Sequence, residues 1–448
     1  MARRGDRRSE RFEATGGRLR LTVGREELVL AIGDAVTVPK GTPPTFAVEG
    51  AEPVGLVATF DPAGAMEAFF AELHRLVRDG HIDARGRPRS LAVAPFALSH
   101  LDEFRPACAP GRLQRGVLAT LARGFRVRAR GYVVAVRAIA VREWGGRDKL
   151  ELLDLEPPPV APDGVLVRIR AAGLNPVDYK VREGRLAGAF PFHFPVVLGW
   201  DAAGVVERVG PAVTWFKPGD PVYGYCRRHD LQYGTYAEYT TVPEGYLAHM
   251  PPELSFEQAG ALPLAVLTAH QAIERSGLRH GETVFVPAGA GGVGHLAIQL
   301  AVERGARVIA TASPPNHSFL RELGAEPLDY RDPDLVAKVH ECAEADGPDA
   351  ALDPLGGDSR EQAFAALRRG GRIVSIASPA PEPREGYEVH YIFVRPSGYD
   401  LGEHVTPLVQ EGRLRPDVEE TYPLERASEA MERLEEGHVR GKLVLTIE

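Results

Sequence analysis

A glycine-rich run at residues 289–294 offers the clearest chemistry in this sequence of 448 residues. The run reads Gly289-Ala290-Gly291-Gly292-Val293-Gly294. It follows an apolar stretch, residues 283–287, that predicts a strand, and it opens a predicted helix with one apolar face over residues 292–304. Glycines permit a tight turn and let backbone N–H groups approach a pyrophosphate at the positive end of the helix. We therefore expect a dinucleotide site here; the alternative is a glycine-rich turn without a ligand.

The end of the next predicted strand, residues 307–311, indicates which nicotinamide cofactor the loop favours. Sites for NAD usually place Asp or Glu about 20 residues beyond the glycines, where it binds the ribose 2′-hydroxyl. Here Ala312 and Ser313 follow the strand, without an acid. A carboxylate would repel a 2′-phosphate, so Ser313 favours NADPH, and Tyr330 is a candidate to flank the adenine ribose. Basic side chains nearby are His317, Arg321 and Arg331, of which the first two are equally well explained as solvated helix residues.

The region around this loop alternates strands with helices from about residue 255 onward, which predicts a parallel sheet with helical crossovers. The predicted strands are residues 283–287, 307–311, 350–353 and 371–377, and the predicted helices are residues 292–304, 317–323, 335–345 and 360–369. We therefore expect an α/β, doubly wound Rossmann domain at residues 257–395. Upstream, from about residue 132 to residue 251, short strands such as 133–141 and 164–171 alternate with Gly and Pro turns.

Several stretches between residues 135 and 448 resemble, in order, the medium-chain dehydrogenase/reductase superfamily in its zinc-free quinone oxidoreductase (zeta-crystallin-like) branch. Besides the glycine loop they are residues 172–178 (AGLNPVD), 198–204 (LGWDAAG), 234–239 (GTYAEY), 267–269 (LTA) and 437–442 (GHVRGK). The resemblance implies a GroES-like β-rich catalytic domain at residues 135–256, completed by about residues 396–448. It also implies an active site in the cleft beside the Rossmann domain, and a homodimer.

The resemblance includes a test for zinc. Zinc-dependent relatives carry a cysteine where Asn175 stands and a His-Glu pair where Trp200 and Asp201 stand. The fourteen histidines show no cluster with ligand spacing either, so we expect no catalytic metal. Without a Lewis acid, hydride transfer needs an acceptor that is already electron-poor, such as a quinone or an α,β-unsaturated carbonyl.

The resemblance also implies roles for individual residues near the nicotinamide. Asn175 and Asp178 would lie beside it, and Thr268 would contact the cofactor. Tyr179 and Lys180 are candidates to donate a proton or to stabilise an enolate. Ordinary core packing is the alternative for Tyr179.

Two further segments resemble parts of the family's cofactor site. Residues 389–395 resemble the strand beside the nicotinamide, which makes Phe393 and Val394 wall residues, although an aromatic-rich strand is also typical of plain core. Lys442 resembles the lysine that closes the cofactor site, and a surface lysine is the alternative. Relatives that reduce enoyl thioesters carry a tyrosine shortly after a glycine equivalent to Gly184, where this chain has Arg185-Leu186, which weakens that assignment.

The N-terminal residues 1–130 predict a small antiparallel β unit followed by helices. Its predicted strands are residues 18–23, 27–32, 35–38 and 54–60, and its predicted helices are residues 65–78 and 113–123. The run from Gly33 to Pro44 resembles the second half of a cupin barrel, with Pro44 in the position of a metal-binding histidine. We therefore interpret this segment as a truncated cupin-like accessory module without a metal.

Composition and charge narrow the function classes. Net charge is −8; residues 1–135 hold 21 Lys+Arg against 15 Asp+Glu, and the remainder holds 32 against 46. The N-terminal arginines are scattered among acids without interleaved aromatics, which favours a solvated surface over a nucleic-acid patch.

The cysteines and the apolar runs indicate the compartment. Cys108, Cys226 and Cys342 lie far apart without CxxC spacing, which argues against a disulfide framework or a four-cysteine zinc lobe. No run approaches the roughly 20 apolar residues of a membrane span, and the basic N-terminus lacks the apolar core of a secretory signal. We expect a cytoplasmic protein that binds neither membrane nor nucleic acid.

The leading hypothesis is therefore a zinc-independent, NADPH-dependent reductase whose partner is a small electrophilic acceptor. A second hypothesis keeps the NADPH site but assigns it to a sensor or ligand-binding fusion protein with little turnover. A third, a metal-dependent cupin enzyme with a reductase partner domain, requires bound metal.

Overall fold

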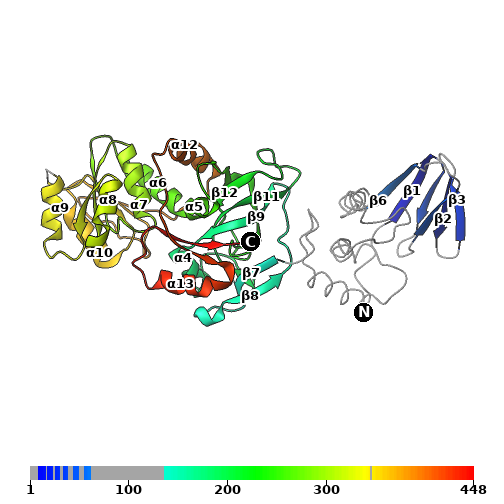
Figure 1. Ribbon diagram of the computed structural model, residues 1–448, viewed down its shortest axis with the longest axis horizontal. Coiled ribbons are helices and arrows are strands. Elements are labelled where there is room, and N and C mark those ends of the chain that lie inside the picture. Colours follow the sequence, from blue (N-terminus) through cyan, green and yellow to red (C-terminus); the bar gives the residue numbers. More distant parts are fainter. Residues whose placement is uncertain are drawn as a thin grey trace. The chain divides into compact units, whose positions relative to one another are not determined.

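The computed structural model describes residues 9–16, 18–23, 26–30, 34–38, 44–49, 55–61, 136–343 and 346–448. The chain divides into two compact units, Met1–Val134 and Ala135–Glu448 (Figure 1).

The described strands of the N-terminal unit form two antiparallel sheets of three strands each, ordered β4-β1-β6 and β3-β2-β5. Their bounds are β1 Ser9–Gly16, β2 Arg18–Val23, β3 Glu26–Leu30, β4 Ala35–Val38, β5 Pro44–Glu49 and β6 Gly55–Asp61. The expected antiparallel unit is confirmed, although the sequence pattern predicts neither β1 nor β5. Pro44, at the position of the expected cupin histidine, begins β5. The helices predicted at residues 65–78 and 113–123 lie outside the described residues.

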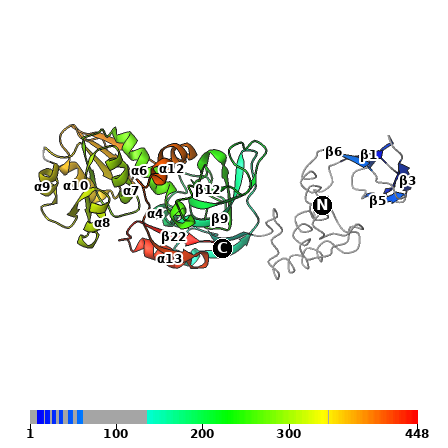
Figure 2. The same ribbon diagram turned by 45° about the horizontal axis from the view of Figure 1, so that its top comes forward.

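The C-terminal unit begins with a β-rich part. Its larger sheet follows the path β14-β12-β11-β9-β22-β21, with β13 paired to β9, and its smaller sheet is ordered β10-β7-β8. The bounds are β7 Val136–Val141, β8 Glu151–Leu155, β9 Gly164–Gly173, β10 Val196–Val197, β11 Asp201–Val209, β12 Pro221–Tyr225, β13 Tyr239–Pro243, β14 Leu247–His249, β21 Val418–Pro423 and β22 Lys442–Thr446. In β22, Val444 lies antiparallel to Gly173 of β9, so the end of the chain completes a sheet that begins far upstream (Figure 2).

Between these segments the chain forms a sheet of six parallel strands, ordered β17-β16-β15-β18-β19-β20. The bounds are β15 Thr283–Val286, β16 Arg307–Ala312, β17 Ala325–Asp329, β18 Ala350–Asp353, β19 Arg372–Ser375 and β20 Glu388–Tyr391. The four predicted strands are confirmed within a few residues, and β17 and β20 extend the sheet at its two edges. The strand order reverses between β15 and β18, which is where open α/β sheets bind ligands.

The helices of this unit cover the sheet and connect the two parts. Their bounds are α4 Pro176–Arg182, α5 Phe256–Ala261, α6 Pro263–Ser276, α7 Gly294–Glu303, α8 His317–Glu322, α9 Leu335–Ala343, α10 Gly357–Ala366, α11 Gly398–Asp400, α12 Thr406–Gln410 and α13 Ala427–Glu435. Short 3-10 turns are η1 Arg147–Lys149, η2 Glu244–Tyr246, η3 Pro314–Asn316 and η5 Leu424–Arg426, and η4 Leu401–Val405 is a π-helical turn. All four residues of β15 are buried, as expected for a central parallel strand covered on both faces.

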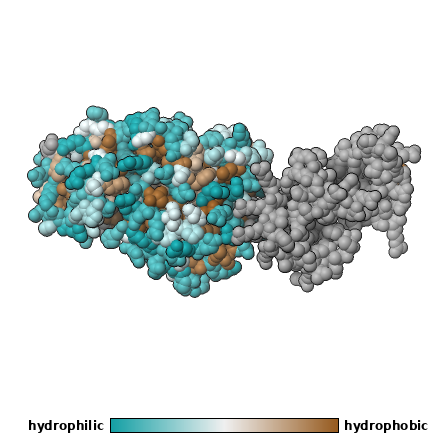
Figure 3. Space-filling model, in the orientation of Figure 1, coloured by the Kyte–Doolittle hydropathy of each residue, from teal (hydrophilic) through white to brown (hydrophobic). Residues whose placement is uncertain are grey.

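Helix α6 positions the site because it contacts both parts, packing against α7 and β19 on one side and β12 on the other. Proline begins it, and Gly277, with φ of 60° in the left-handed region, ends it. No helix among the described residues combines the length and apolar character needed to cross a bilayer. The face of the C-terminal unit seen in Figure 3 is largely hydrophilic, with scattered apolar side chains.

Candidate active site

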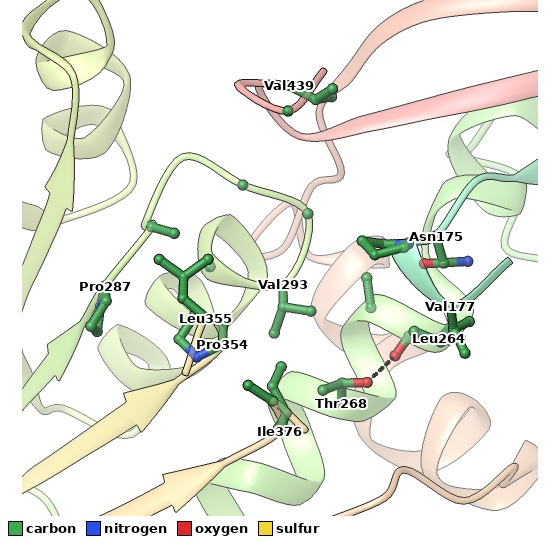
Figure 4. A pocket seen from close by; sticks show the side chains of 18 of the residues that line it. Asn175, Val177, Leu264, Thr268, Pro287, Val293, Pro354, Leu355, Ile376 and Val439 are labelled. Atoms are coloured by element: carbon green, nitrogen blue, oxygen red, sulfur yellow. Dashed lines mark hydrogen bonds between the residues drawn. The ribbon is translucent and has the colours of Figure 1, made fainter. Parts of the chain in front are cut away.

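A cleft of about 1040 Å³ lies between the β-rich part and the parallel sheet of the C-terminal unit. The glycine loop after β15 forms one wall, and the start of α4 forms another. Helix α6 contributes Thr268, and the C-terminal segment closes the cleft through Val439 and Lys442. Figure 4 shows Asn175, Thr268, Val293 and Val439 arranged around this space, contributed by four separate segments.

The glycines of the loop divide into two structural roles. A Cβ atom on Gly289 would lie 2.8 Å from the Ala310 Cβ, and one on Gly294 would lie 2.3 Å from the Ala288 carbonyl oxygen. These two glycines therefore allow the strand, the turn and α7 to pack closely. A Cβ on Gly291 would meet only the Ala288 oxygen, at 3.3 Å. Gly291 thus leaves the open approach that a pyrophosphate needs at the N-terminus of α7.

The backbone around the loop is arranged to hold an anion. The N–H groups of Gly292 and Val293 take part in none of the backbone hydrogen bonds among the described residues, and both residues line the cleft. Gly441 N–H donates to the Ala290 carbonyl at 2.8 Å, which fixes the C-terminal segment against the loop. The loop therefore fits a dinucleotide diphosphate.

Ser313 and Tyr330, which the sequence assigns to the adenine ribose, line the part of the cleft beyond β16. The sequence pattern missed one carboxylate here: Asp329, at the end of β17, lies opposite Ala312 of β16. Arg331 holds Asp329 through two hydrogen bonds of 3.1 Å, and these lower the pKa of Asp329. Arg331 is therefore committed to Asp329 and offsets its charge. Asp329 was missed because β17 itself was not predicted.

A buried polar network joins the start of α4 to β11 and β22. The Asn175 amide nitrogen donates to Asp201 Oδ2 at 2.8 Å, and Lys442 Nζ donates to Asn175 Oδ1 at 2.5 Å. Lys442 Nζ also donates to the Leu174 carbonyl at 2.7 Å and lies 3.7 Å from Asp201 Oδ2. Asp201 accepts a further bond of 2.7 Å from the Leu264 N–H at the start of α6. One carboxylate thus ties together α4, α6 and β22.

Asp178 lies directly behind this network and is 1% exposed. Its Oδ2 accepts hydrogen bonds of 2.7 Å from Tyr236 OH and from the Asn175 N–H, while its Oδ1 has no partner. Burial raises the pKa of Asp178 to about 7 and that of Asp201 to about 6, and burial lowers the pKa of Lys442. Two carboxyl groups share one ammonium in a desolvated space, which favours the neutral form of Asp178 at pH values below about 7.

Aromatic rings form part of the cleft wall. Phe190 and Phe393 lie with centroids 5.8 Å apart, and Phe190 also contacts Trp200 edge to face. The Arg227 guanidinium lies 5.1 Å from the Phe190 centroid and 5.3 Å from that of Phe393. The sequence reasoning identified Phe393 as a wall residue but missed its aromatic neighbours, which come from separate loops.

Charged residues on the cleft wall share one sign. Lys180, Arg185 and Lys442 line it, and among the described lining residues none is Asp or Glu. Arg185 is paired with Glu183 at 2.7 Å. Lys180 has no carboxylate within ion-pair distance among the described residues, and burial lowers its pKa. Lys180 is therefore the cation best placed to act on a bound molecule.

Of the remaining predicted site residues, some line the cleft and others lie behind its wall. Val394 lines the cleft beside Phe393. Thr268 also lines it, although its hydroxyl donates to the Leu264 carbonyl at 2.6 Å within α6. Tyr179 is not among the lining residues; it is partly buried against the hydrophobic core, which agrees with the packing alternative. Asp178 and Gly289 support the wall from behind rather than forming its surface.

Comparisons with known proteins agree with this architecture. The alcohol dehydrogenase GroES-like domain family matches residues 161–252, and the zinc-binding dehydrogenase family matches residues 323–445. The NADPH-dependent alkenal/one oxidoreductase of Arabidopsis thaliana chloroplasts is 35% identical over 320 residues, which cover 69% of this chain and 79% of that protein. The solved quinone oxidoreductase from Coxiella burnetii superposes with a TM-score of 0.64 and 34% identity, over 70% of this chain and 100% of that one.

A relative of another kind matches a longer part of this chain. The spectinabilin polyketide synthase system protein NorB of Streptomyces orinoci is 34% identical over 389 residues, which cover 82% of this chain and 17% of that protein. The match covers more of this chain than the C-terminal unit, Ala135–Glu448, contains. It therefore extends into the residues before Ala135.

The C-terminal unit thus has the fold and cleft of a two-part reductase, a GroES-like β domain beside a Rossmann-like sheet of six parallel strands. The chain belongs to the medium-chain dehydrogenase/reductase superfamily, in its quinone oxidoreductase and alkenal reductase branch. It is an oxidoreductase of the quinone and alkenal reductase type.

Proposed function

We propose that this chain uses NADPH to reduce α,β-unsaturated carbonyl compounds or quinones, without a catalytic metal. The observation that carries the proposal is the cleft itself. It joins a glycine loop fit for a dinucleotide to an aromatic chamber whose described charged lining residues are cations. Such a chamber suits a conjugated, electron-poor acceptor, on whose oxygen negative charge develops during reduction.

Residues at the position of a catalytic zinc do not fit the ion. Asn175 and Asp201 stand there, and both interact with the Lys442 ammonium. A Zn²⁺ ion would be repelled by that ammonium, and an amide is not among the usual zinc ligands. The Lys442 charge supplies the compensation that a metal would otherwise give, so no step of the reaction is assigned to zinc.

The preference for NADPH over NADH is supported by the adenine end of the cleft. Ser313 replaces the usual acid after β16, and Arg331 neutralises the carboxylate of Asp329 on the neighbouring strand. A 2′-phosphate therefore meets no uncompensated negative charge among the described residues there. The Arabidopsis relative is likewise named as NADPH-dependent.

Reduction of a conjugated carbonyl requires a hydride at the β-carbon and a proton at the α-carbon. Bound NADPH supplies the hydride from C4 of its nicotinamide. Lys180 faces the cleft with a pKa lowered by burial, so it can stabilise the enolate oxygen and then deliver the proton. The aromatic wall of Phe190, Trp200 and Phe393 excludes water and orients the conjugated plane.

The direct experiment mixes the full chain with NADPH and trans-2-alkenals, cyclic enones or small quinones, and follows oxidation of the cofactor. We expect turnover with conjugated acceptors and none with the corresponding saturated aldehydes. Lys180→Met should lower kcat for enones by about 10²-fold or more, the usual contribution of a general acid, and remove one limb of the pH profile. Saturable NADPH binding without turnover of any acceptor would instead support the sensor hypothesis.

A second candidate acceptor is an α,β-unsaturated thioester, which is favoured by the match to NorB, a protein named as part of a polyketide synthase system. The chemistry is the same, but the acyl group would arrive on a carrier. The pair Arg185-Leu186 after Gly184 lacks the tyrosine of thioester-reducing relatives, which weighs against this acceptor. Comparison of kcat/KM for crotonyl N-acetylcysteamine thioester and for a free enone of equal length separates the two.

A further inference from the structure

Two histidines and an aspartate that are far apart in the sequence meet outside the catalytic cleft. His270 comes from α6, Asp400 from the end of α11, and His404 from the π-helical turn η4. One potential ligand atom from each of the three lies within 4.8 Å of the other two. The sequence shows no histidine cluster with ligand spacing, because this set forms only when α6 meets the C-terminal segment.

Local structure holds two of these residues in place. Ser397 Oγ accepts a hydrogen bond of 3.0 Å from the Asp400 N–H and so caps the turn. Asp400 and His404 are four residues apart along continuous helical backbone, so both point to one face. A π-helical turn such as η4 is uncommon and is frequently found at functional sites.

Asp400 is the most buried member of the cluster, at 8% exposed, and among the described residues no hydrogen bond or ion pair engages its carboxylate. Its oxygens are not among the enclosed side-chain atoms that lack a partner, so the carboxylate is accessible to a ligand. The groups it faces are the imidazoles of His270 and His404, which can share a cation with it.

We propose that His270, Asp400 and His404 bind a divalent transition metal ion, with Zn²⁺ as the favoured ion, and leave a fourth position for water. Two imidazoles with one carboxylate form a common zinc ligand set. Ligand bonds of about 2.0–2.1 Å require the three atoms to approach more closely than they do here. The exposed His404, whose ring stacks on that of His270 at a centroid distance of 5.1 Å, is free to make this adjustment.

The charged side chains near His270 are compatible with a bound metal ion. Arg304, one of two cations near His270, is paired with Glu274, and the other, Arg395, is exposed. His270 is half-buried, and the cluster brings its imidazole together with His404 and the carboxylate of Asp400. His270 lies two residues beyond Thr268 on α6, and Asp400 and His404 follow the wall residues Phe393 and Val394 in the sequence. A metal there would clamp this wall to α6.

The experiment titrates Zn²⁺ into the full chain after chelator treatment, with Mg²⁺ as the hard-ion control. We expect one equivalent of Zn²⁺ to bind and to raise Tm, and Mg²⁺ to do neither. His404→Ala removes an exposed ligand without disturbing the core and should weaken Zn²⁺ binding at least tenfold, as should Asp400→Asn. His229→Ala, at an exposed histidine outside the cluster, serves as the matched control.

The proposal is overturned if no stoichiometric Zn²⁺ binds, or if His404→Ala and Asp400→Asn bind it as tightly as His229→Ala does. NADPH oxidation is measured on the same samples, so failure of the metal site is distinguishable from failure of the proposed reductase activity.

Discussion

Lys442 Nζ lies 2.5 Å from the side-chain oxygen of Asn175, although the two residues are 267 positions apart in the chain. The contact joins the last strand, β22, to the start of α4, and it places an ammonium beside Asp201. It therefore provides both the closure of the cleft and the charge compensation of its buried carboxyl groups.

Removal of this ammonium should destabilise the protein strongly. Lys442→Met leaves Asp201 buried without a cation, and loss of one partner of a buried pair usually costs about 3–5 kcal/mol. Chemical denaturation of the full chain checks this value. The double variant with Asp201→Asn should recover part of the loss, because it removes the uncompensated charge. Independent, additive effects of the two changes would contradict the network.

Two glycines of the loop should respond differently to substitution. Gly291→Asp places a carboxylate where little surrounds the Cβ, so the fold should persist while the Kd for NADPH rises by about 100-fold or more. Gly294→Ala places a methyl group 2.3 Å from the Ala288 oxygen and should instead lower stability by about 1–3 kcal/mol. Fluorescence titration and thermal unfolding of both variants distinguish the two roles. Equal loss of binding and stability in both variants would count against the assignment.

Arg331 should determine part of the cofactor preference. Arg331→Ala frees the Asp329 carboxylate at the adenine end of the cleft, which should raise the KM for NADPH several-fold and leave the KM for NADH nearly unchanged. Asp329→Asn in the same background should restore the preference. The ratio of kcat/KM for the two cofactors is the measurement, and an unchanged ratio in Arg331→Ala would show that the pair lies outside the cofactor's reach.

Asp178 should make the free energy of unfolding fall as pH rises. A carboxylate whose pKa is lowered in the folded chain has the opposite effect. Its pKa is about 7 in the folded chain and 3.8 in its ordinary state, so between these values the folded chain holds a proton that the unfolded chain has lost. Stability therefore falls as pH rises through this window, by up to about 1.4 kcal/mol per pH unit. Asp178→Asn should reduce the slope, and Asp201, whose pKa is raised to about 6, should account for the slope that remains below about pH 6. Asp148→Asn at an exposed site should leave the slope unchanged. An unchanged slope in Asp178→Asn would mean that other groups carry it.

The Rossmann half could be predicted from the sequence because its signals are local. The glycine loop, the apolar stretch before it and the helical periodicity after it occupy contiguous residues, and β15 and α7 appear within a few residues of their expected positions. The edge strand β17 was missed because its sequence, AEPLD, has little β-branched or aromatic character.

The site could be predicted only in part because much of it depends on contacts between distant segments. Asn175 and Lys442 were identified by resemblance, but their shared network with Asp201 appears only when β22 joins β9. The cluster of His270, Asp400 and His404 could not be predicted for the same reason, because its members come from segments far apart in the sequence. Tyr179 illustrates the reverse case: it neighbours two site residues in sequence but packs into the core.

Transfer of deuterium to a trans-2-alkenal, from NADPH with deuterium at both C4 positions, follows the hydride itself. We expect one deuterium at the β-carbon of the saturated aldehyde, with the α-hydrogen taken from solvent. Unlabelled product would contradict direct hydride transfer from the cofactor to the conjugated acceptor.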